Sequence, residues 1–370
     1  MERIFALCNG DRLTCTAQAA IIRFSGPRAV LSTGANGGGI RYDLTTAFNY
    51  CDCGTAGVCQ PMEGNTLREH QRAVARRLGL DPDRVTGLDT AANLDNMVVI
   101  TKRWEDLQIT AAVSGGADVN ALCAGDPTFL TETDEAPCPV PPGTINIFLV
   151  TDRPLSPGAM AELIMTATEA KTAVLRDLMQ GSSVSQELAT GTGTDGIVII
   201  CQAGEEGMLF NAGKHFKFGE LAAQAVREAV TQALFRQTGL CAHGQHAVLR
   251  RLQRFGITGE KLSAYCLTRM PDQHAAFART LEKLDRDAFL VSAVSLYVHL
   301  EDQRRAEMLT EPEAADWAEH ILKEVCRHYC CHIPTPGDGC LMEKMEHFLC
   351  QLMLANLQER ARLYPGEKPI

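Results

Sequence analysis

Short apolar runs bounded by glycine, proline or aspartate recur through the first two-thirds of the chain. Runs of this kind, rich in valine, isoleucine and threonine, are typical of β-strands. Several are apolar at every position, which indicates strands whose two faces are both covered. The predicted strands span residues 28–33, 97–101, 109–113, 144–150 and 197–201.

Two segments between these strands carry the period of an amphipathic helix. The first begins at Ser156-Pro157, a capping residue followed by a first-turn proline, and ends before Gly181. The second spans about residues 219–235 and places its leucine, valine and alanine residues on one side. Strands and helices interleaved in this way predict an α/β or α+β domain with a mixed sheet and flanking helices.

From about residue 239 onward, glycine and β-branched runs become rare and helical periods take over. A chain of 370 residues is long enough for two domains. We therefore predict that an α/β domain over residues 1–238 precedes an all-α domain over residues 239–370, whose role the pattern does not reveal. The helical patterns lie at 242–255, 274–285, 288–300, 312–331 and 340–364, with a turn at 333–339.

Composition excludes several classes of protein. The chain is 45% hydrophobic and 22% charged, as soluble globular proteins are. Its net charge of −10 argues against a general affinity for nucleic acid, and the arginines of residues 68–77 are spaced like one solvated helix face. Neither a secretory signal nor an apolar run of about 18 residues is found. We expect a cytoplasmic protein that binds neither nucleic acid nor membranes.

Fifteen cysteines are scattered along the chain, an odd number that makes a poor disulfide framework and fits a reducing compartment. Two clusters stand out, one at residues 51–59 and one, with His332, at residues 326–340. Neither matches the spacing of a common zinc site. We expect buried thiols and no metal at either cluster.

Two glycine-rich loops are candidates for binding a polar ligand. Residues 189–196 (ATGTGTDG) have the spacing of a dinucleotide fingerprint, but a strand follows them instead of a helix, so a Rossmann site is not expected. The loop presents threonine hydroxyls and the Asp195 carboxylate at the entrance of a strand. Residues 31–39 (LSTGANGGG) end a strand in glycines whose amides can bind an oxyanion.

Three charged or titratable side chains suggest chemistry. At about 100° per residue, Lys171 projects from the centre of the apolar stripe of the first helix, which suits a proton donor or anion clamp, a structural ion pair, or a snorkelling side chain. Glu169 projects to the opposite side, where we expect a surface pair with Arg176. His215 lies between a strand and the second helix, a usual place for a general base, although a structural role is the alternative.

Seven segments, in order along the chain, closely resemble the adenosylcobinamide amidohydrolase family of corrinoid salvage. The resemblance covers about residues 24–235, and its most specific part is ATEAK, followed by ATGTGTD and then by Gly-x-His-x-x-x-Gly-Glu. The segments are LSTGANGGG (31–39), VTGLDTAAN (85–93), ALCAGD (121–126), GTINIFLV (143–150), ATEAKTAVLRDL (167–178), ATGTGTDGIVII (189–200) and AGKHFKFGEL (212–221).

This resemblance implies an enzyme that hydrolyses a linear amide. The bond joins the aminopropanol arm of adenosylcobinamide to the corrin ring, and the products are adenosylcobyric acid and 1-amino-2-propanol for cobalamin synthesis. The corrinoid substrate brings its own cobalt, so no other cofactor is expected, and a homo-oligomer is compatible with the family. The chain departs from the family at 114–121 (SGGADVNA) and 51–59 (CDCGTAGVC). The altered segment 114–121 keeps a non-catalytic corrinoid carrier as one alternative. The GTGTDG loop at 191–196 keeps a nucleotide-dependent enzyme as another.

Amide hydrolysis needs a nucleophile, a proton donor for the leaving amine and a group that stabilises the oxyanion. By the resemblance, His215 or Asp195 activates water or the hydroxyl of Thr192 or Thr194, while Lys171 protonates the amine or holds the oxyanion. Cleavage of the chain before Thr144, which would free an N-terminal threonine, is another route. The residues expected to bind substrate are Asn36, Gly37, Gly38, Gly39, Thr144, Asn146, Glu169, Thr190 and Thr192.

Overall fold

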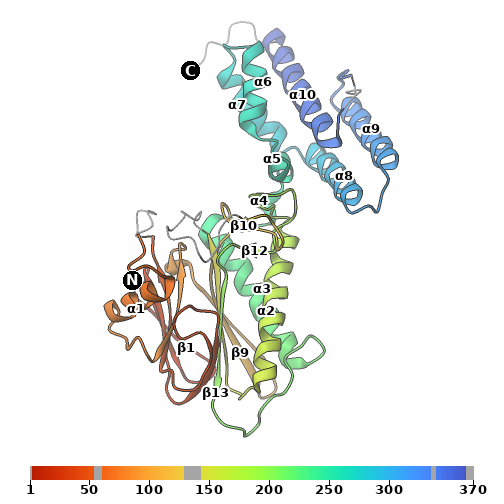
Figure 1. The fold of residues 1–370 in the computed structure, drawn as a ribbon. Helices are drawn as coiled ribbons and strands as arrows, with labels where there is room; N and C mark the ends of the chain where they lie inside the picture. Colours follow the sequence, from red (N-terminus) through yellow and green to blue (C-terminus); the bar gives the residue numbers. More distant parts are fainter. Residues whose placement is uncertain (1, 54–60, 129–142, 335–338, 364–370) are drawn as a thin grey trace. The chain divides into compact units, whose positions relative to one another are not determined.

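The chain divides into two compact units, the N-terminal unit Met1–Cys241 and the C-terminal unit Ala242–Ile370 (Figure 1). The computed structural model describes residues 2–53, 61–128, 143–334 and 339–363. The N-terminal unit contains mixed sheets with flanking helices, and the described part of the C-terminal unit is helical. These features confirm the predicted fold class.

The larger sheet of the N-terminal unit has the strand order β5-β4-β13-β11-β9-β8. In it, β11 and β13 run parallel, and all other neighbours are antiparallel. Each strand predicted from an apolar run belongs to this sheet. Its strands are β4 (Arg28–Ser32), β5 (Gly39–Arg41), β8 (Val98–Trp104), β9 (Leu107–Gly116), β11 (Thr144–Thr151) and β13 (Gly196–Gln202).

Two long helices, α2 (Pro157–Asp177) and α3 (Lys217–Thr238), lie side by side against this sheet (Figure 1). The Ser156 side chain caps α2 by accepting a hydrogen bond from the Ala159 amide. At its far end, α3 stops at Gly239, which takes the left-handed conformation that suits glycine, with φ +76°. Both helices agree with the predicted pattern.

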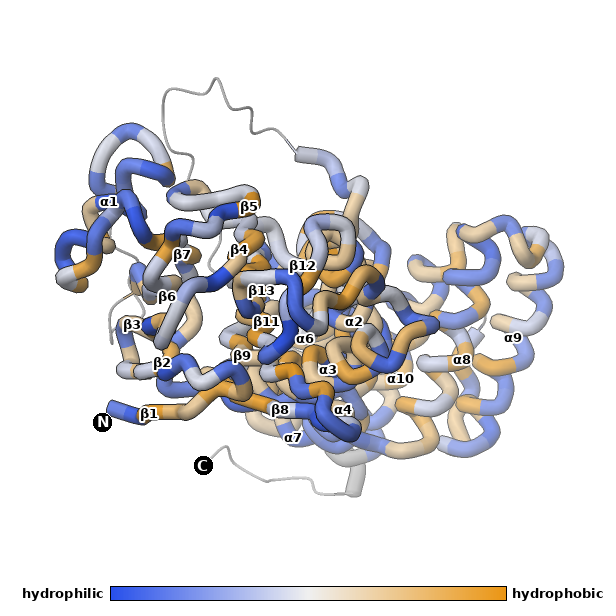
Figure 2. Tube along the Cα trace, turned by 90° about the horizontal axis from the view of Figure 1, so that it is seen from below, coloured by the Kyte–Doolittle hydropathy of each residue, from blue (hydrophilic) through white to orange (hydrophobic). Residues whose placement is uncertain are grey.

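Alternate residues of the central strands pack into two different cores. Ile147, Leu149 and Ile199 belong to the core that α2 and α3 cover, whereas Phe148 and Val198 belong to a core on the opposite face. Figure 2 shows these central strands as mostly hydrophobic. Coverage on both faces is the physical reason for the continuous apolar runs in the sequence.

A second sheet covers that opposite face, with strand order β1-β2-β3-β6-β7. The sequence pattern did not predict it, because its strands are four to six residues long and several contain polar residues. The parallel strands β6 and β7 are connected through helix α1 (Leu67–Arg77). The strands are β1 (Arg3–Ala6), β2 (Arg12–Cys15), β3 (Ala19–Arg23), β6 (Thr46–Cys51) and β7 (Val85–Thr90).

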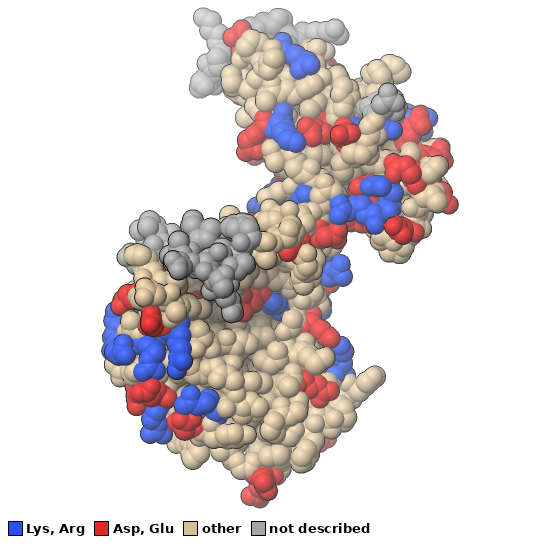
Figure 3. Space-filling view, viewed as in Figure 1, with Lys and Arg blue, Asp and Glu red and all other residues tan. Residues whose placement is uncertain are grey.

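Arginines of α1 alternate with acidic side chains on the surface of the N-terminal unit (Figure 3). Arg72 pairs with Asp83 at 2.8 Å, and Arg77 pairs with Glu63 at 2.5 Å. These ion pairs agree with the solvated helix face predicted for residues 68–77. The other side of the same helix is buried and carries His70.

The C-terminal unit packs its helices around a core that includes Tyr297, Phe348 and Leu352. The pattern at 242–255 is broken into two short helices and a 3₁₀ turn, and α6 was not predicted. No helix of the described ranges is long and apolar enough to cross a membrane. The helices are α4 (Ala242–Gln245), α5 (Val248–Leu252), α6 (Gly259–Arg269), α7 (His274–Asp285), α8 (Ala288–Arg305), α9 (Glu311–His328) and α10 (Leu341–Leu363).

Candidate functional site

One edge of the larger sheet gathers most of the loops that the sequence singled out. At this edge, which we call the site edge, β4 and β9 end while β11 and β13 begin. Above it, β10 (Ala121–Leu122) pairs with β12 (Gly191–Thr192) (Figure 1). The loops at 33–38 and 193–195 therefore lie near the first residues of β11, although they are distant in sequence.

A buried ion pair between Lys171 and Asp195 lies at the centre of the site edge. Lys171, on α2, is only 6% exposed, as its place in the apolar stripe predicts. The carboxylate of Asp195 also accepts hydrogen bonds from the Thr192 amide at 3.0 Å, the Thr192 hydroxyl at 2.6 Å and the Ile145 amide at 2.9 Å. Both carboxylate oxygens thus accept two bonds each, so Asp195 holds the loop, the helix and β11 together.

Gly191 allows this ion pair to form. A Cβ atom at that position would meet Asp195 Oδ2 and would lie 2.7 Å from Lys171 Nζ. Any other residue would therefore have to displace the ion pair. Packing against the ion pair thus accounts for the glycine at position 191.

A pair of threonine hydroxyls lies beside the ion pair. Thr144 is the buried first residue of β11, and its Oγ1 is hydrogen-bonded to Oγ1 of the exposed Thr194. Thr194 Oγ1 in turn donates to the carbonyl oxygen of Gly143 at 3.2 Å. Asn120 Nδ2 donates to the same oxygen at 2.8 Å. The hydroxyl pair thus combines a buried group with one that is open to solvent.

Two other residues that were predicted to bind substrate form structural hydrogen bonds. Thr190 accepts a hydrogen bond from the Ala124 amide at 2.9 Å, and its carbonyl accepts one from Thr172 on α2. Asn146 Nδ2 donates to Asn49 Oδ1 at 3.0 Å and to the Asp89 carbonyl at 2.8 Å. Asn146 therefore connects the two sheets next to the site edge.

The glycine-rich loop after β4 packs closely on the backbone of β7. A Cβ on Gly37 would lie 2.5 Å from the Val85 carbonyl oxygen, and one on Gly38 would meet the Gly34 carbonyl oxygen. The side chain of Asn36 donates to the carbonyls of Pro82 and Val85, both at 3.0 Å. Close packing explains these glycines, and a role for the loop in substrate binding stays a prediction.

The pairing expected for Glu169 differs from the structure, whereas the role expected for His215 stays a prediction. Glu169 forms an ion pair with Lys214 and not with Arg176, because the segment before α3 returns alongside α2. His215 is exposed on that segment. The segment is attached to the first half of α2 by a hydrogen bond of 2.6 Å from the Ala212 amide to the Glu162 carboxylate. Among the contacts of the described residues, none joins His215 to Lys171 or Asp195. A junction between a strand and a helix does not by itself place a side chain at the site edge.

Sequence reasoning missed a cluster of Asp52, His70 and Asp89 that lies just beyond Asn146. His70 Nε2 is 2.9 Å from Asp52 Oδ1 and 4.0 Å from Asp89 Oδ1. Gln71 Nε2 donates to Asp89 Oδ2 at 2.5 Å, whereas Asp89 Oδ1 is buried without a hydrogen bond. Burial and the charge of Asp52 raise the pKa of Asp89 to about 7. Asp89 lies in VTGLDTAAN and Asp52 in CDCGTAGVC, two segments that the sequence analysis chose for other reasons. Nothing in the sequence joins them to His70, because the three residues come from separate segments.

The ligand atoms of this cluster all lie within 4.8 Å of one another, as in a metal site. However, His70 Nδ1 accepts a hydrogen bond from the Glu63 amide at 2.9 Å, so the neutral ring carries its proton on Nε2. A metal ligand needs a lone pair on the nitrogen that faces the ion. The observed contacts therefore favour a hydrogen-bonded acid–base cluster.

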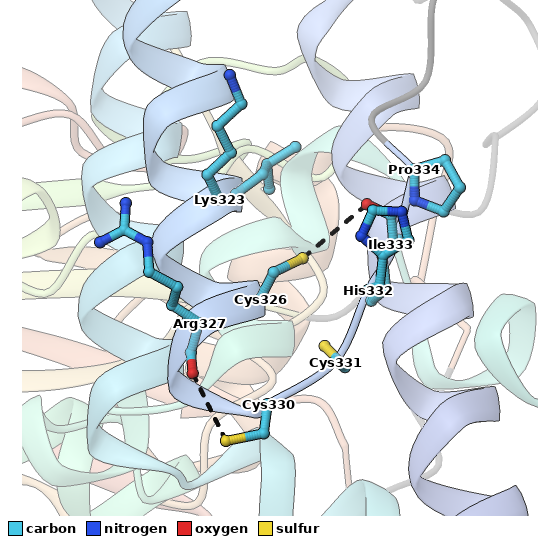
Figure 4. Close-up of a pocket in the computed structure, with 9 residues that line it drawn as sticks. Lys323, Cys326, Arg327, Cys330, Cys331, His332, Ile333 and Pro334 are labelled. Atoms are coloured by element: carbon cyan, nitrogen blue, oxygen red, sulfur yellow. Dashed lines mark hydrogen bonds between the residues drawn. The ribbon is translucent and has the colours of Figure 1, made fainter.

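The second cysteine cluster lines a pocket of about 610 Å³ in the C-terminal unit (Figure 4). Cys326 Sγ is directed to the Ile333 carbonyl, while Cys330 Sγ is directed to the Arg327 carbonyl on another side. Burial and the neighbouring Cys326 raise the pKa of Cys331 to about 11, which keeps it a thiol. Cys326 and Cys331 are thus neighbours, whereas the Cys330 sulfur is directed away from them.

In the first cysteine cluster, Cys51 is a buried free thiol, as expected. Cys53 is disulfide-bonded, so the expectation of a thiol is wrong there. Cys59 lies outside the described residues.

The raised pKa of Asp89 predicts that stability depends on pH. Folded Asp89 keeps its proton up to about pH 7, whereas the usual value for the carboxyl group is 3.8. Between these values the folded chain binds more protons, so the free energy of unfolding decreases as pH rises from about 4 to about 7. We expect Asp89→Asn to remove this part of the decrease, measured by urea unfolding at several pH values. An unchanged slope would contradict the assignment.

A family profile and one named relative indicate the same family. A profile of the adenosylcobinamide amidohydrolase family matches residues 5–242. An uncharacterized protein of Methanocaldococcus jannaschii is 32% identical over 240 residues, which are 61% of this chain and 89% of that protein. An adenosylcobinamide amidohydrolase of Halobacterium salinarum is 32% identical over 130 residues, 34% of this chain and 50% of that protein.

Among solved structures, the PH0078 protein of Pyrococcus horikoshii is matched over 65% of this chain and 86% of its own, with 14% identity and a TM-score of 0.32. The profile match ends at residue 242, next to the boundary between the two units, so nearly all of the C-terminal unit lies outside it. It covers well over half of the sequence and includes every residue of the site edge. The chain therefore belongs to the adenosylcobinamide amidohydrolase family.

Proposed function

We propose that this protein hydrolyses the amide between the aminopropanol arm and the corrin ring of adenosylcobinamide. One observation carries the proposal: a buried Lys171–Asp195 ion pair lies beside the Thr144–Thr194 hydroxyl pair, at the site edge. Family membership supports the substrate class. The products are adenosylcobyric acid and 1-amino-2-propanol, and the cobalt belongs to the substrate.

Lys171 is the cationic group of the proposed reaction. Asp195 is saturated by hydrogen bonds and the ion pair, so it orients Lys171 and does not take a proton from water. An ammonium group held in a partly desolvated site stabilises the negative charge that develops on the substrate carbonyl oxygen. The same group can return a proton to the leaving amine.

The nucleophile is assigned to the hydroxyl pair. A threonine hydroxyl that attacks the amide forms an ester with the corrin carboxyl group and releases 1-amino-2-propanol, after which water hydrolyses the ester. Thr194 is exposed to solvent, and Thr144 is fixed in β11. Thr192 is less suited to the attack because its hydroxyl proton is committed to Asp195.

Direct detection of products tests the proposal. Purified protein is incubated with adenosylcobinamide in the dark, and mass spectrometry follows adenosylcobyric acid and free 1-amino-2-propanol. We expect both products in equal amounts. Tight binding of an intact substrate would instead support the corrinoid carrier. The carrier alternative is motivated by residues 114–121, which differ from the family pattern. This segment includes Asn120, which contacts Gly143 at the site edge.

Two substitutions separate the roles that the sequence left open. We expect Lys171→Ala to lower kcat by about 100-fold or more, as loss of an acid–base or charge-stabilising group does. His215→Ala should leave kcat near that of the wild type, because this side chain is exposed and contacts neither member of the ion pair among the described contacts. Lys214→Ala, which removes the surface ion pair with Glu169 of α2, is the matched control. The reverse ranking of Lys171 and His215 would overturn the assignment.

A further inference from the structure

The peptide bond between Gly143 and Thr144 is held in an unusual way. Its carbonyl oxygen accepts hydrogen bonds from two side chains of different loops, Asn120 at 2.8 Å and Thr194 at 3.2 Å. Two donors aimed at one carbonyl oxygen polarise it and would stabilise an oxyanion there, as the donors of an oxyanion hole do. The residue that follows this carbonyl is Thr144, whose hydroxyl belongs to the candidate site.

The hydrogen bonds also define a path for a proton. The Thr144 hydroxyl faces two acceptors on Thr194, its Oγ1 and, at 3.4 Å, its carbonyl oxygen. In the arrangement in which Thr194 donates to the Gly143 oxygen, Thr144 is the donor to Thr194 Oγ1. Attack of Thr144 Oγ1 on the preceding carbonyl carbon can therefore pass its proton through Thr194 to the carbonyl oxygen. No additional base is needed for this step.

Glycine at position 143 is required by the arrangement. Its φ is +148°, which an L side chain rarely adopts, and an added Cβ would lie 2.9 Å from Cβ of Asn120. A larger residue would push Asn120 away from the carbonyl that it contacts. Gly143 therefore leaves room for the Asn120 donor, and Thr144 carries the hydroxyl nucleophile.

We propose that the protein cleaves its own chain between Gly143 and Thr144, and that the freed Thr144 is the nucleophile of the site. The role of Thr144 as the nucleophile rests on the proposed amide hydrolysis, whereas the self-cleavage does not. Thr144 Oγ1 attacks the Gly143 carbonyl carbon and forms a five-membered cyclic intermediate. The carbon–nitrogen bond then breaks, the proton moves to the Thr144 nitrogen, and an ester links Gly143 to Thr144 Oγ1. Water hydrolyses the ester to a Gly143 carboxyl group and a free Thr144 hydroxyl and amine.

The products of cleavage suit the proposed reaction. A terminal α-amine next to the threonine hydroxyl can take its proton, which is the activation that N-terminal threonine nucleophiles use. Thr144 stays in place because β11 remains paired with β9 and β13, and because Asp195 accepts from the adjacent Ile145 amide. The Asn120 and Thr194 donors would then be free to bind the carbonyl oxygen of a substrate.

The full chain, purified and incubated, is examined by intact mass and by N-terminal sequencing. We expect fragments 1–143 and 144–370, whose masses sum to that of the intact chain plus one water. Thr144→Ala should abolish cleavage, Thr144→Ser should retain it, and Asn120→Ala should slow it by about 100-fold. Thr151→Ala, at the buried opposite end of the same strand, is the matched control and should cleave normally.

Two results would overturn the self-cleavage. One is an intact chain that turns over adenosylcobinamide, which would leave the proposed function standing. The other is cleavage of Thr144→Ala at the same bond, which would indicate another protease. A cleaved chain without any hydrolysis of adenosylcobinamide would instead support the self-cleavage and contradict the proposed function.

Discussion

A lysine ammonium group can be buried in a protein core only when a carboxylate and further hydrogen bonds compensate for its lost hydration. In this protein Asp195 compensates Lys171, and the rest of the site edge depends on that pair. Removing one partner of such a pair costs about 3–5 kcal/mol, because the other charge stays buried. The loop that carries Asp195 must therefore approach α2 closely, which only a glycine at position 191 allows. The same loop carries Thr194 to the start of β11, where it meets Thr144.

Buried polar contacts between the two sheets extend this organisation. Asn146 donates to Asn49 and to the Asp89 carbonyl, and Asn49 donates to Ser114 at 2.8 Å. Most polar groups in a protein core are hydrogen-bonded, and these contacts join the second sheet to the first. They also place the acid–base cluster of His70 and Asp89 close to β11. The acid–base cluster and the Lys171–Asp195 ion pair thus lie on either side of one structural asparagine in the chain of contacts, since Asp89 contacts Asn146 and Asp195 contacts the adjacent Ile145.

The sequence predicted the larger sheet well because each of its central strands is covered on both faces and is therefore apolar throughout. It missed the second sheet, whose short strands contain polar residues such as Asn49 and Asp89. Lys171 was found because helical periodicity determines which side of α2 is buried. The role of His215 stays a prediction, because sequence position gives no information on tertiary placement, and His70 was missed because its partners come from other segments.

The central claim is that Lys171 and Asp195 act as one unit in amide hydrolysis. A double-mutant cycle tests it most directly, by measuring kcat for adenosylcobinamide with Lys171→Ala, Asp195→Asn and the double variant. Groups that act as a unit are strongly non-additive, so the double variant should be about as slow as Lys171→Ala alone. Losses that multiply in the double variant would show that the two residues act independently and would contradict the account.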